Sequence, residues 1–348
     1  MDLEEIIVAT YQPPYTITPD ILNRVVEIGE LLGRWSMQAE TASPLLRKEN
    51  RIRTIQASLA IENNNLSTEQ VTAIIDGKRV LAPIRDIQEV RNAILAYEKL
   101  PDWRSSRLTD LLTAHRLLMT GLVDRPGQFR WGGVGIYREK QLIHMAPPAS
   151  QIPRLVGELL TWLKQTDTHP LISSSIFHYE FEFIHPFTDG NGRMGRLWQT
   201  LILSEWRPEL AWLPVETLIH YQQQDYYQVL RECDRTSDCT LFINFMLEKL
   251  AEALKENLDL QKQNAVAMSV EMSVQMPVEM SVEKPQPVSA TSQKILSAII
   301  AYPAITITQL AEELGLSRRT IERNIKILRD TGYLSRVGAK KGGYWRVK

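Results

Sequence analysis

The sequence predicts a mainly α-helical protein that carries one small β-hairpin and ends in a helix-turn-helix domain. Apolar residues recur at intervals of three and four along most of the chain, as expected of amphipathic helices. Within the first 250 residues, only the segment around 133–145 has the character of two strands joined by a turn. The last sixty or so residues contain three short helical patterns followed by a second hairpin-like stretch.

Length and charge narrow the class of protein. The chain has 348 residues, which suggests two or three domains, and 44% of them are hydrophobic. Its 40 basic and 41 acidic residues give a formal charge of -1, so any affinity for nucleic acid must be local. No apolar run approaches the roughly 18 residues of a membrane span, and the acidic start is unlike a signal peptide. We therefore expect a cytoplasmic protein that makes no membrane contact.

The amino-terminal third is expected to be an extended arm followed by helices. Prolines in residues 11–20 exclude a helix there. The helices expected next cover residues 19–35, 44–61, a segment from Ser67 or Thr68, and 86–100. Asn63 to Asn65 is a plausible helix stop, and Ser67 with Gln70 forms a capping-box pattern. A helix over 108–122, the turn 126–130 and strands over 133–137 and 142–145 follow. His115 is expected on a polar helix face near the core.

The densest polar chemistry of the chain lies between two expected helices, 172–184 and 194–206. The segment from His185 to Arg196 reads His-Pro-Phe-Thr-Asp-Gly-Asn-Gly-Arg-Met-Gly-Arg. Because it opens a helix amino terminus, its free N–H groups and the helix dipole form an anion site. His185 could accept a proton, Asp189 suits magnesium, and arginine forks three residues apart can grip phosphate. The alternative is a capped interhelical turn with a core histidine.

This segment resembles the signature of the Fic family, His-Pro-Phe-x-Asp-Gly-Asn-Gly-Arg-x-x-Arg, at every specified position. The resemblance implies a helical core that transfers AMP from ATP to a Ser, Thr or Tyr hydroxyl of a target protein. It implies that His185 is the base, that Asp189 holds Mg²⁺ and that Phe187 packs inward. Related Doc kinases usually have lysine where this chain has Gly192, which favours AMP transfer. The residues implied to contact ATP are Val134, Gly135, Ile136, Tyr137, Asp189, Gly190, Asn191, Gly192, Arg193, Met194, Gly195, Arg196 and Tyr226.

A second resemblance lies at the end of the helix expected over 44–61. Ser58-Leu-Ala-Ile-Glu62-Asn63 is similar to the inhibitory motif Ser/Thr-x-x-x-Glu-Gly/Asn of many Fic proteins. A carboxylate paired with Arg196 would occupy the γ-phosphate position, so that ATP binds with its α-phosphate out of line. Two alternatives remain open. Glu62 is a solvated carboxylate at a helix end, or it activates water to remove AMP from a modified target.

The hairpin and the helices after the signature complete the expected core. By resemblance, the hairpin is a flap that adds a strand to the target segment. Further helices are expected over 219–231, which carries Tyr226 near the adenine, and over 240–258. His178 is expected to be a packed helix histidine, and Asp234 stands where relatives often have an amide.

Residues 261–290 change in composition and are expected to form a flexible linker. Alternating Met and Val residues between 268 and 283 leave a strand as the alternative. The tail then resembles a winged helix, with helices over 292–301, 306–314 and 317–330. Residues 317–348 hold ten basic and two acidic residues, a local charge of +8. Arg318, Arg319, Arg323 and Lys326 would meet DNA, whereas a protein-docking winged helix is the alternative.

The expected domains are residues 1–100 with the inhibitory helix, the catalytic core 101–258, the linker 261–290 and the winged helix 291–348. The expected function is self-inhibited AMP transfer with ATP as substrate and Mg²⁺ as cofactor. Alternatives are a de-AMPylating hydrolase, or a DNA-binding regulator whose Fic core only senses nucleotide. The expected partners are a target protein, the chain itself through self-AMPylation or a homodimer, and DNA through 317–348.

Overall fold

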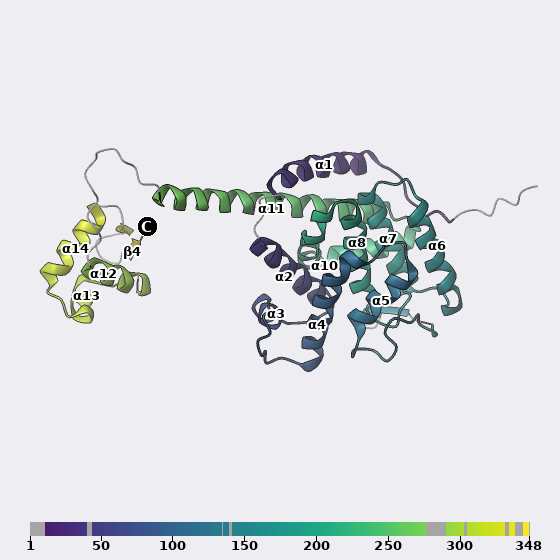
Figure 1. The fold of residues 1–348 in the computed structure, drawn as a ribbon, viewed down its shortest axis with the longest axis horizontal. Coiled ribbons are helices and arrows are strands. Elements are labelled where there is room, and N and C mark those ends of the chain that lie inside the picture. The colour runs from purple at the N-terminus through teal and green to yellow at the C-terminus, as the bar shows by residue number, and fades with distance from the viewer. Residues whose placement is uncertain are drawn as a thin grey trace, which may run out of the picture. The chain divides into compact units, whose positions relative to one another are not determined.

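The computed structural model describes residues 11–39, 44–133, 135–138, 141–275, 290–302, 305–330, 334–337 and 344–347. The chain divides into two compact units, Met1–Val274 and Gln275–Lys348, which are described separately. In the first unit, the described residues form a helical assembly with one hairpin, as the sequence predicts (Figure 1).

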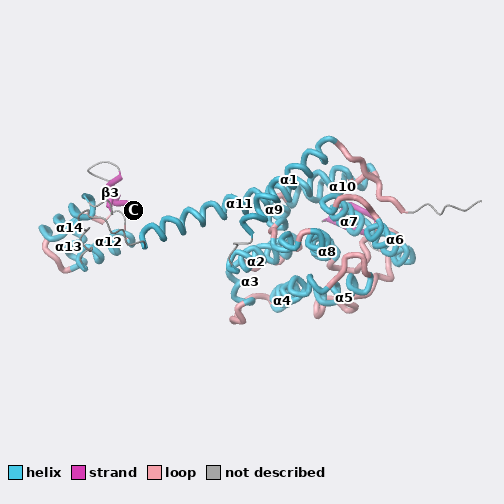
Figure 2. The backbone as a smooth tube through the Cα atoms, turned by 45° about the horizontal axis from the view of Figure 1, so that its top comes forward, coloured by secondary structure: helices cyan, strands magenta, loops and turns pink. Residues whose placement is uncertain are grey.

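The helices of the first unit are α1 Pro19–Ala39, α2 Pro44–Ile61, α3 Thr68–Ile75, α4 Ile84–Lys99, α5 Leu108–Met119, α6 Ile152–Gln165, α7 Pro170–Ile184, α8 Asn191–Trp206, α9 Val215–Tyr221, α10 Gln223–Thr236 and α11 Thr240–Gln275. Three 3₁₀ turns cover Leu100–Asp102, Ala149–Gln151 and Pro208–Trp212. Strands β1 Gly135–Arg138 and β2 Gln141–Met145 pair antiparallel, with Gly135 opposite Met145. Figure 2 shows this hairpin in magenta among helices, and β2 contacts α10.

Helices α7 and α8 form the centre of the first unit and pack on each other. Twelve of the fifteen residues of α7 are buried, because its sequence is apolar or small on almost every side. Phe177, Phe181 and Trp198 are fully buried where the two helices meet their neighbours. The turn that joins these two core helices is therefore held in place from both ends.

Local signals set several boundaries as predicted. Helix α2 covers the expected Pro44–Ile61, and Asn63 follows it with a left-handed φ of 68°. The Ser67 capping box is formed, with both of its hydrogen bonds present. Helix α7 ends at Ile184, directly before the His185-Pro186 step.

Three expected elements differ from the structure. The single helix expected over 219–231 is two helices, α9 and α10, because the chain breaks at Gln222 and each part turns its own apolar residues into the core. Helix α8 begins at Asn191, three residues earlier than expected, after Gly190 with φ 86°. Helix α11 runs to Gln275, so residues 261–275 are helical instead of linker or strand. The reason is the absence of Gly and Pro between Thr240 and Pro277. The rest of the expected linker, 276–289, lies outside the described residues.

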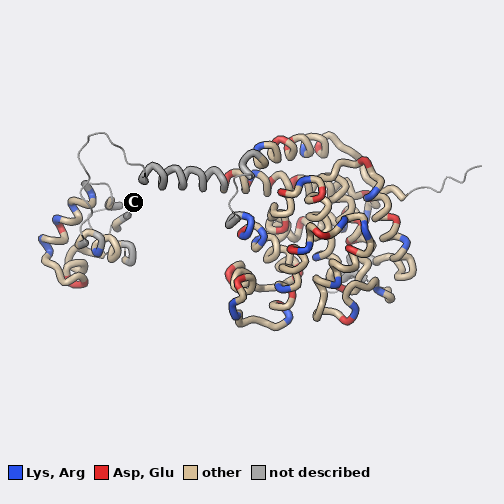
Figure 3. Tube along the Cα trace, viewed as in Figure 1, with Lys and Arg blue, Asp and Glu red and all other residues tan. Residues whose placement is uncertain are grey.

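The second unit is the expected winged helix-turn-helix. Helices α12 Ala290–Ala301, α13 Ile307–Leu314 and α14 Arg318–Asp330 precede the antiparallel strands β3 Leu334–Val337 and β4 Tyr344–Val347. Its core contains Ile295, Leu310, Ile321 and Trp345. Figure 3 shows in blue that Lys and Arg positions recur along α14, and Arg318, Arg319, Arg323 and Lys326 are all exposed. Within the described ranges, no helix combines the length and apolar composition that crossing a bilayer requires.

Candidate active site

The turn between α7 and α8 is braced by the amide of Asn191. Asn191 is buried; its Nδ2 donates to the Phe187 carbonyl at 2.9 Å, and the Phe187 N–H donates to its Oδ1 at 2.9 Å. Both ends of the amide are therefore engaged within the loop, where the sequence suggested a donor for ATP. His185 precedes this brace in a left-handed conformation, with φ 49° and ψ 61°.

His115 supports the loop from α5, a role that the sequence did not reveal. Its ring stacks on Phe187 with centroids 3.6 Å apart and an interplanar angle of 6°. The Gly127 N–H donates to His115 Nδ1 at 2.8 Å, so Nε2 carries the proton and donates to the Asp189 carbonyl at 3.0 Å. Burial lowers the pKa of His115 to about 4. A neutral, fully buried imidazole thus fixes Phe187, which packs inward as expected.

Arg193 is turned toward two carboxylates. Its NH1 donates to Glu89 Oε1 and its NH2 to Asp189 Oδ1, both at 3.0 Å. Glu89 also accepts from Asn64 Nδ2 at 2.9 Å, and the Arg85 guanidinium lies 3.6 Å from Asp189 Oδ2. Arg193 was expected to grip phosphate, and in this structure it joins α4 to the loop. Glu89, on α4, and Asn64, in the loop after α2, give no sequence signal for this role.

Arg196 meets the expected inhibitory segment. Its NH2 donates to Glu62 Oε1 at 2.8 Å and to the Ser58 carbonyl at 2.9 Å, and its Nε donates to Ser58 Oγ at 3.1 Å. Burial alone would lower the pKa of Arg196, but the nearby charge of Glu62 raises it above its ordinary value. The Arg196 side chain is 1% exposed and that of Glu62 is 29% exposed, so the carboxylate keeps one side toward solvent.

Gly192 lets the Glu62 carboxylate approach the amino terminus of α8. A methyl group at Gly192 would collide with Glu62 Oε1, so no larger residue fits while this carboxylate is in place. At this position the carboxylate also lies where the dipole of α8 favours negative charge. Glu62 is thus an anion already seated at the anion site that the signature predicts.

The other residues expected to contact ATP lie in β1, behind the loop, or outside the described residues. Gly135, Ile136 and Tyr137 lie in β1, and Val134 lies outside the described residues. A methyl group at Gly190 would press on Met119, and one at Gly195 on His178. Met194 is fully buried. Gly190, Met194 and Gly195 therefore contribute to the packing behind the loop.

Tyr226 lies in the core instead of at an open face where a base could stack. It is 1% exposed, and its hydroxyl donates to His178 Nε2 at 3.1 Å. His178 in turn donates from Nδ1 to Gln199 Oε1 at 2.7 Å, which confirms it as a packed helix histidine. Burial lowers the pKa of His178 to about 3. The adjacent Tyr227 is partly exposed.

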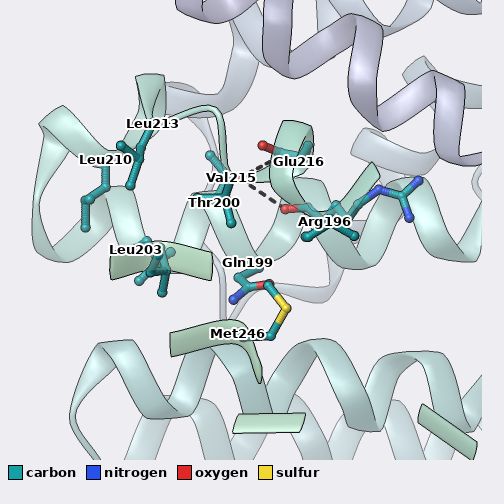
Figure 4. Close-up of a pocket in the computed structure, with 11 residues that line it drawn as sticks. Arg196, Gln199, Thr200, Leu203, Leu210, Leu213, Val215, Glu216 and Met246 are labelled. Carbon is teal, nitrogen blue, oxygen red and sulfur yellow. Dashed lines mark hydrogen bonds between the residues drawn. The ribbon is translucent and has the colours of Figure 1, made fainter. Parts of the chain in front are cut away.

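A small pocket of about 10 Å³ lies behind Arg196, between α8, α9 and α11 (Figure 4). Thr200 Oγ1 lies within hydrogen-bond distance of the Arg196 carbonyl, at 3.1 Å, and of Glu216 Oε1, at 3.3 Å, and its one proton can be donated to either. Burial raises the pKa of Glu216 to about 7. This volume matches about one water molecule, so the pocket is too small for a nucleotide.

Comparison with known proteins adds to this geometry. Residues 105–203 match the Fic/DOC family, and residues 291–345 match an HTH domain. A crystal structure of a Fic family protein from Desulfovibrio desulfuricans G20 is 50% identical in sequence, covers 97% of this chain and 98% of that chain, and superposes with a TM-score of 0.69. The chain belongs to the Fic family.

Other relatives of this Fic protein are more distant. The structure of Fic-1 from C. elegans is 21% identical over 70% of this chain and 75% of that chain, with a TM-score of 0.55, and shares the fold. Curated proteins named protein adenylyltransferase Fic are 28% identical, in Nematostella vectensis over 214 residues and in Aedes aegypti over 228. These alignments cover 57% and 61% of this chain, and 47% and 42% of the relatives. The chain thus spans less than half the length of the curated relatives it matches.

Proposed function

We propose that this Fic protein is a protein adenylyltransferase that moves AMP from ATP to a hydroxyl of a target protein and is restrained by Glu62. The supporting observation is the Glu62 carboxylate, which lies between Gly192 and Arg196 at the amino terminus of α8. A negative group is stabilised there by a guanidinium and by a helix dipole, which is the environment that a triphosphate requires.

In the proposed reaction, His185 accepts the proton of a Ser, Thr or Tyr hydroxyl as its oxygen attacks the α-phosphorus of ATP. The bond between the α-phosphorus and the oxygen bridging to the β-phosphate breaks, and pyrophosphate leaves. The left-handed backbone of His185 and the Asn191 brace hold the loop, so the base is pre-positioned. Arg196 and the N–H groups at the start of α8 would hold the departing phosphates.

Asp189 fits the magnesium role. Its side chain is 45% exposed, and Arg193, Arg85 and the Gly190 N–H orient it. Among the described residues, no group of three or more His, Cys, Asp or Glu side chains could hold a metal ion. A magnesium ion would therefore need phosphate oxygens of the nucleotide besides Asp189, the usual arrangement for this ion, and would neutralise charge on the phosphates.

Glu62 would restrain the reaction by occupying the place of the γ-phosphate. Because its carboxylate fills the space over Gly192 and pairs with Arg196, a triphosphate could bind only with its phosphates displaced. The α-phosphorus would then be out of line with the target hydroxyl. The contact of Glu62 with Arg196 and Gly192 would thus both mark the anion site and cause the inhibition.

The test uses ATP labelled at the α- or the γ-phosphate, incubated with a Glu62→Gly variant and a lysate from cells lacking the protein. We expect covalent label from α-labelled ATP only, and none when His185→Ala is added to the same variant. Label from γ-labelled ATP would indicate a kinase. ATP binding with no label at all would favour the nucleotide sensor.

For the second unit we propose DNA binding, which the exposed basic residues of α14 support. The proposed organisation is an inhibitory amino-terminal region, a catalytic core and this winged helix, joined through the carboxyl end of α11.

A further inference from the structure

Arg130 is a buried guanidinium between α5 and β1 that bonds to main-chain carbonyls from two separate segments. It is 3% exposed. Its NH1 donates to the Gly132 carbonyl at 2.8 Å and its NH2 to the Pro147 carbonyl at 2.6 Å. Its Nε donates to the His185 carbonyl at 2.7 Å, and NH2 lies 3.4 Å from the Ile184 carbonyl.

The two segments are the base of the hairpin and the turn that carries the catalytic histidine. Gly132 precedes β1 and Pro147 follows β2, so one guanidinium holds both ends of the β1–β2 hairpin. The Arg130 N–H adds a bond to the Pro186 carbonyl at 2.9 Å. Among the strands that the structure describes, β1 and β2 pair only with each other. Because an isolated two-stranded sheet is marginally stable, the position of the hairpin depends on such contacts at its base.

The contact also bears on the unusual backbone of His185. A left-handed conformation is unfavourable for a residue other than glycine and persists only where its surroundings hold it. Two hydrogen bonds hold His185 in this conformation. Arg130 Nε fixes the direction of the His185 carbonyl, and the His185 N–H donates to the Phe181 carbonyl at 3.0 Å. A planar fork with donors on several edges suits this geometry, and a lysine ammonium does not.

We propose that Arg130 is a positioning residue that couples the hairpin to His185, so that a target segment docked on the hairpin finds the base already oriented. The proposal rests on the proposed transferase function for its kinetic consequence, but its structural part does not. It assigns Arg130 no contact with ATP or with the reacting atoms.

The test compares wild type, Arg130→Ala, Arg130→Lys and the surface control Arg154→Ala in the full chain. Arg154 is exposed and donates to two side chains of its own region, Gln151 and Glu158. In Arg130→Ala, we expect amides of residues 132–146 and 184–190 to exchange hydrogen at least about tenfold faster, both segments together. Arg130→Lys should be intermediate, and Arg154→Ala should match wild type.

Kinetics supply the second readout, in a Glu62→Gly background. We expect turnover to fall about 10²-fold in Arg130→Ala while affinity for a fluorescent ATP analogue stays within about twofold. Added methylguanidinium should restore part of the turnover, and it should not rescue His185→Ala. If Arg130→Ala does not fold, as judged by circular dichroism, Arg130→Lys carries the comparison.

Faster exchange in one segment alone, or in neither, would overturn the coupling. Unchanged turnover in a protein whose two segments both exchange faster would overturn the positioning role. If both segments exchange faster in Arg130→Ala but the Glu62→Gly protein transfers no AMP, the coupling stands and the transferase function is rejected instead.

Discussion

The Arg193 guanidinium and the Glu89 carboxylate form a buried ion pair, with NH1 and Oε1 3.0 Å apart and side chains 5% and 10% exposed. Glu89 comes from α4 and Arg193 from α8, so the pair joins the amino-terminal region to the signature. Asn64, two residues after Glu62, donates to the same carboxylate. The segment 58–64 is thus connected to both signature arginines. Glu62 pairs with Arg196, and Asn64 donates to Glu89, which pairs with Arg193.

Glu89→Ala should destabilise the first unit by about 1 to 3 kcal/mol, because Arg193 NH1 and Asn64 Nδ2 lose a buried acceptor while Asp189 still pairs with Arg193. Urea denaturation monitored by tryptophan fluorescence measures this. The exposed Glu69→Ala should shift stability by no more than about 0.5 kcal/mol. Glu89→Leu combined with Arg193→Met should recover most of the loss. A Glu89→Ala variant as stable as wild type would show that the pair contributes little.

His185→Ala should abolish AMP transfer and leave ATP binding nearly intact. General-base catalysis contributes about 10² to 10⁴-fold, and the imidazole supplies none of the phosphate contacts. Labelling with α-labelled ATP and titration with a fluorescent ATP analogue measure the two properties separately. Undiminished transfer by this variant would remove His185 from the mechanism.

Glu62→Gly should raise transfer about 10- to 100-fold. A charge-assisted hydrogen bond contributes about 1.5 to 3 kcal/mol, and each 1.4 kcal/mol corresponds to tenfold in equilibrium. Self-labelling rates measure the gain, with the exposed neighbour Asn65→Ala as control. If Glu62 instead activates water, the variant would lose AMP removal from a pre-modified target. Unchanged labelling and ATP affinity would mean that Ser58 to Asn63 is only a helix end.

His115 should make stability depend on pH. The folded protein holds its pKa at about 4, whereas an unfolded histidine titrates near 6.5. Protonation then favours the unfolded state, so the stabilisation is complete above pH 6.5 and is lost as the pH falls toward 4. At 1.36 kcal/mol per pH unit, about 2 kcal/mol is lost between pH 6.5 and 5.0.

Wild type alone cannot reveal this change, because burial raises the pKa of Glu182 to about 8 and of Glu216 to about 7. These carboxyls bind protons more tightly when folded, and their effect opposes that of His115. The test therefore measures the difference in the free energy of unfolding between wild type and a His115 variant at two pH values. His115→Gln should be less stable than wild type at pH 7, and the gap should narrow by about 2 kcal/mol at pH 5. A gap that stays constant with pH would contradict the depressed pKa.

Reversing charge on α14 should weaken DNA binding by the intact chain. Arg319→Glu with Arg323→Glu should lower affinity and flatten its salt dependence, because each lost phosphate contact reduces the slope of log affinity against log salt by about 1. Fluorescence anisotropy with a labelled duplex at several salt concentrations measures both. Absence of DNA binding by wild type even at low salt would favour the protein-docking alternative.

Local chemistry made much of this fold predictable from sequence. The Ser67 capping box, the stop at Asn63 and the Pro186 step each act within four residues, and each sets the boundary expected of it. The pairing of Glu62 with Arg196 was also expected, because the two motifs together suggested it.

The supporting residues could not be predicted in the same way. His115 meets Asp189 across 74 positions and Glu89 meets Arg193 across 104, and no periodicity links such pairs. A histidine or a glutamate on a helix can equally well lie on a solvent-exposed face, so neither His115 nor Glu89 stands out in the sequence. The burial of Tyr226 and the break before α10 depend likewise on what neighbouring helices cover, which a single helix pattern does not contain.

The last turn of helix α2 combines a buried residue with a partly exposed residue just beyond it. Ser58 is 4% exposed and belongs to the core, whereas the Glu62 side chain, just beyond the helix end, is 29% exposed. In the proposed mechanism, relief of inhibition therefore needs one side chain to rotate into solvent, and the helix itself can stay. Because Glu62 is partly buried and paired with Arg196, this rotation is slower than the picosecond-to-nanosecond rotamer changes of exposed side chains, but it does not need the local unfolding that takes microseconds to seconds. A ligand or partner that binds the rotated Glu62 carboxylate would thus bind a conformation that forms repeatedly. The rate of activation would then depend on how long the carboxylate stays bound in that conformation.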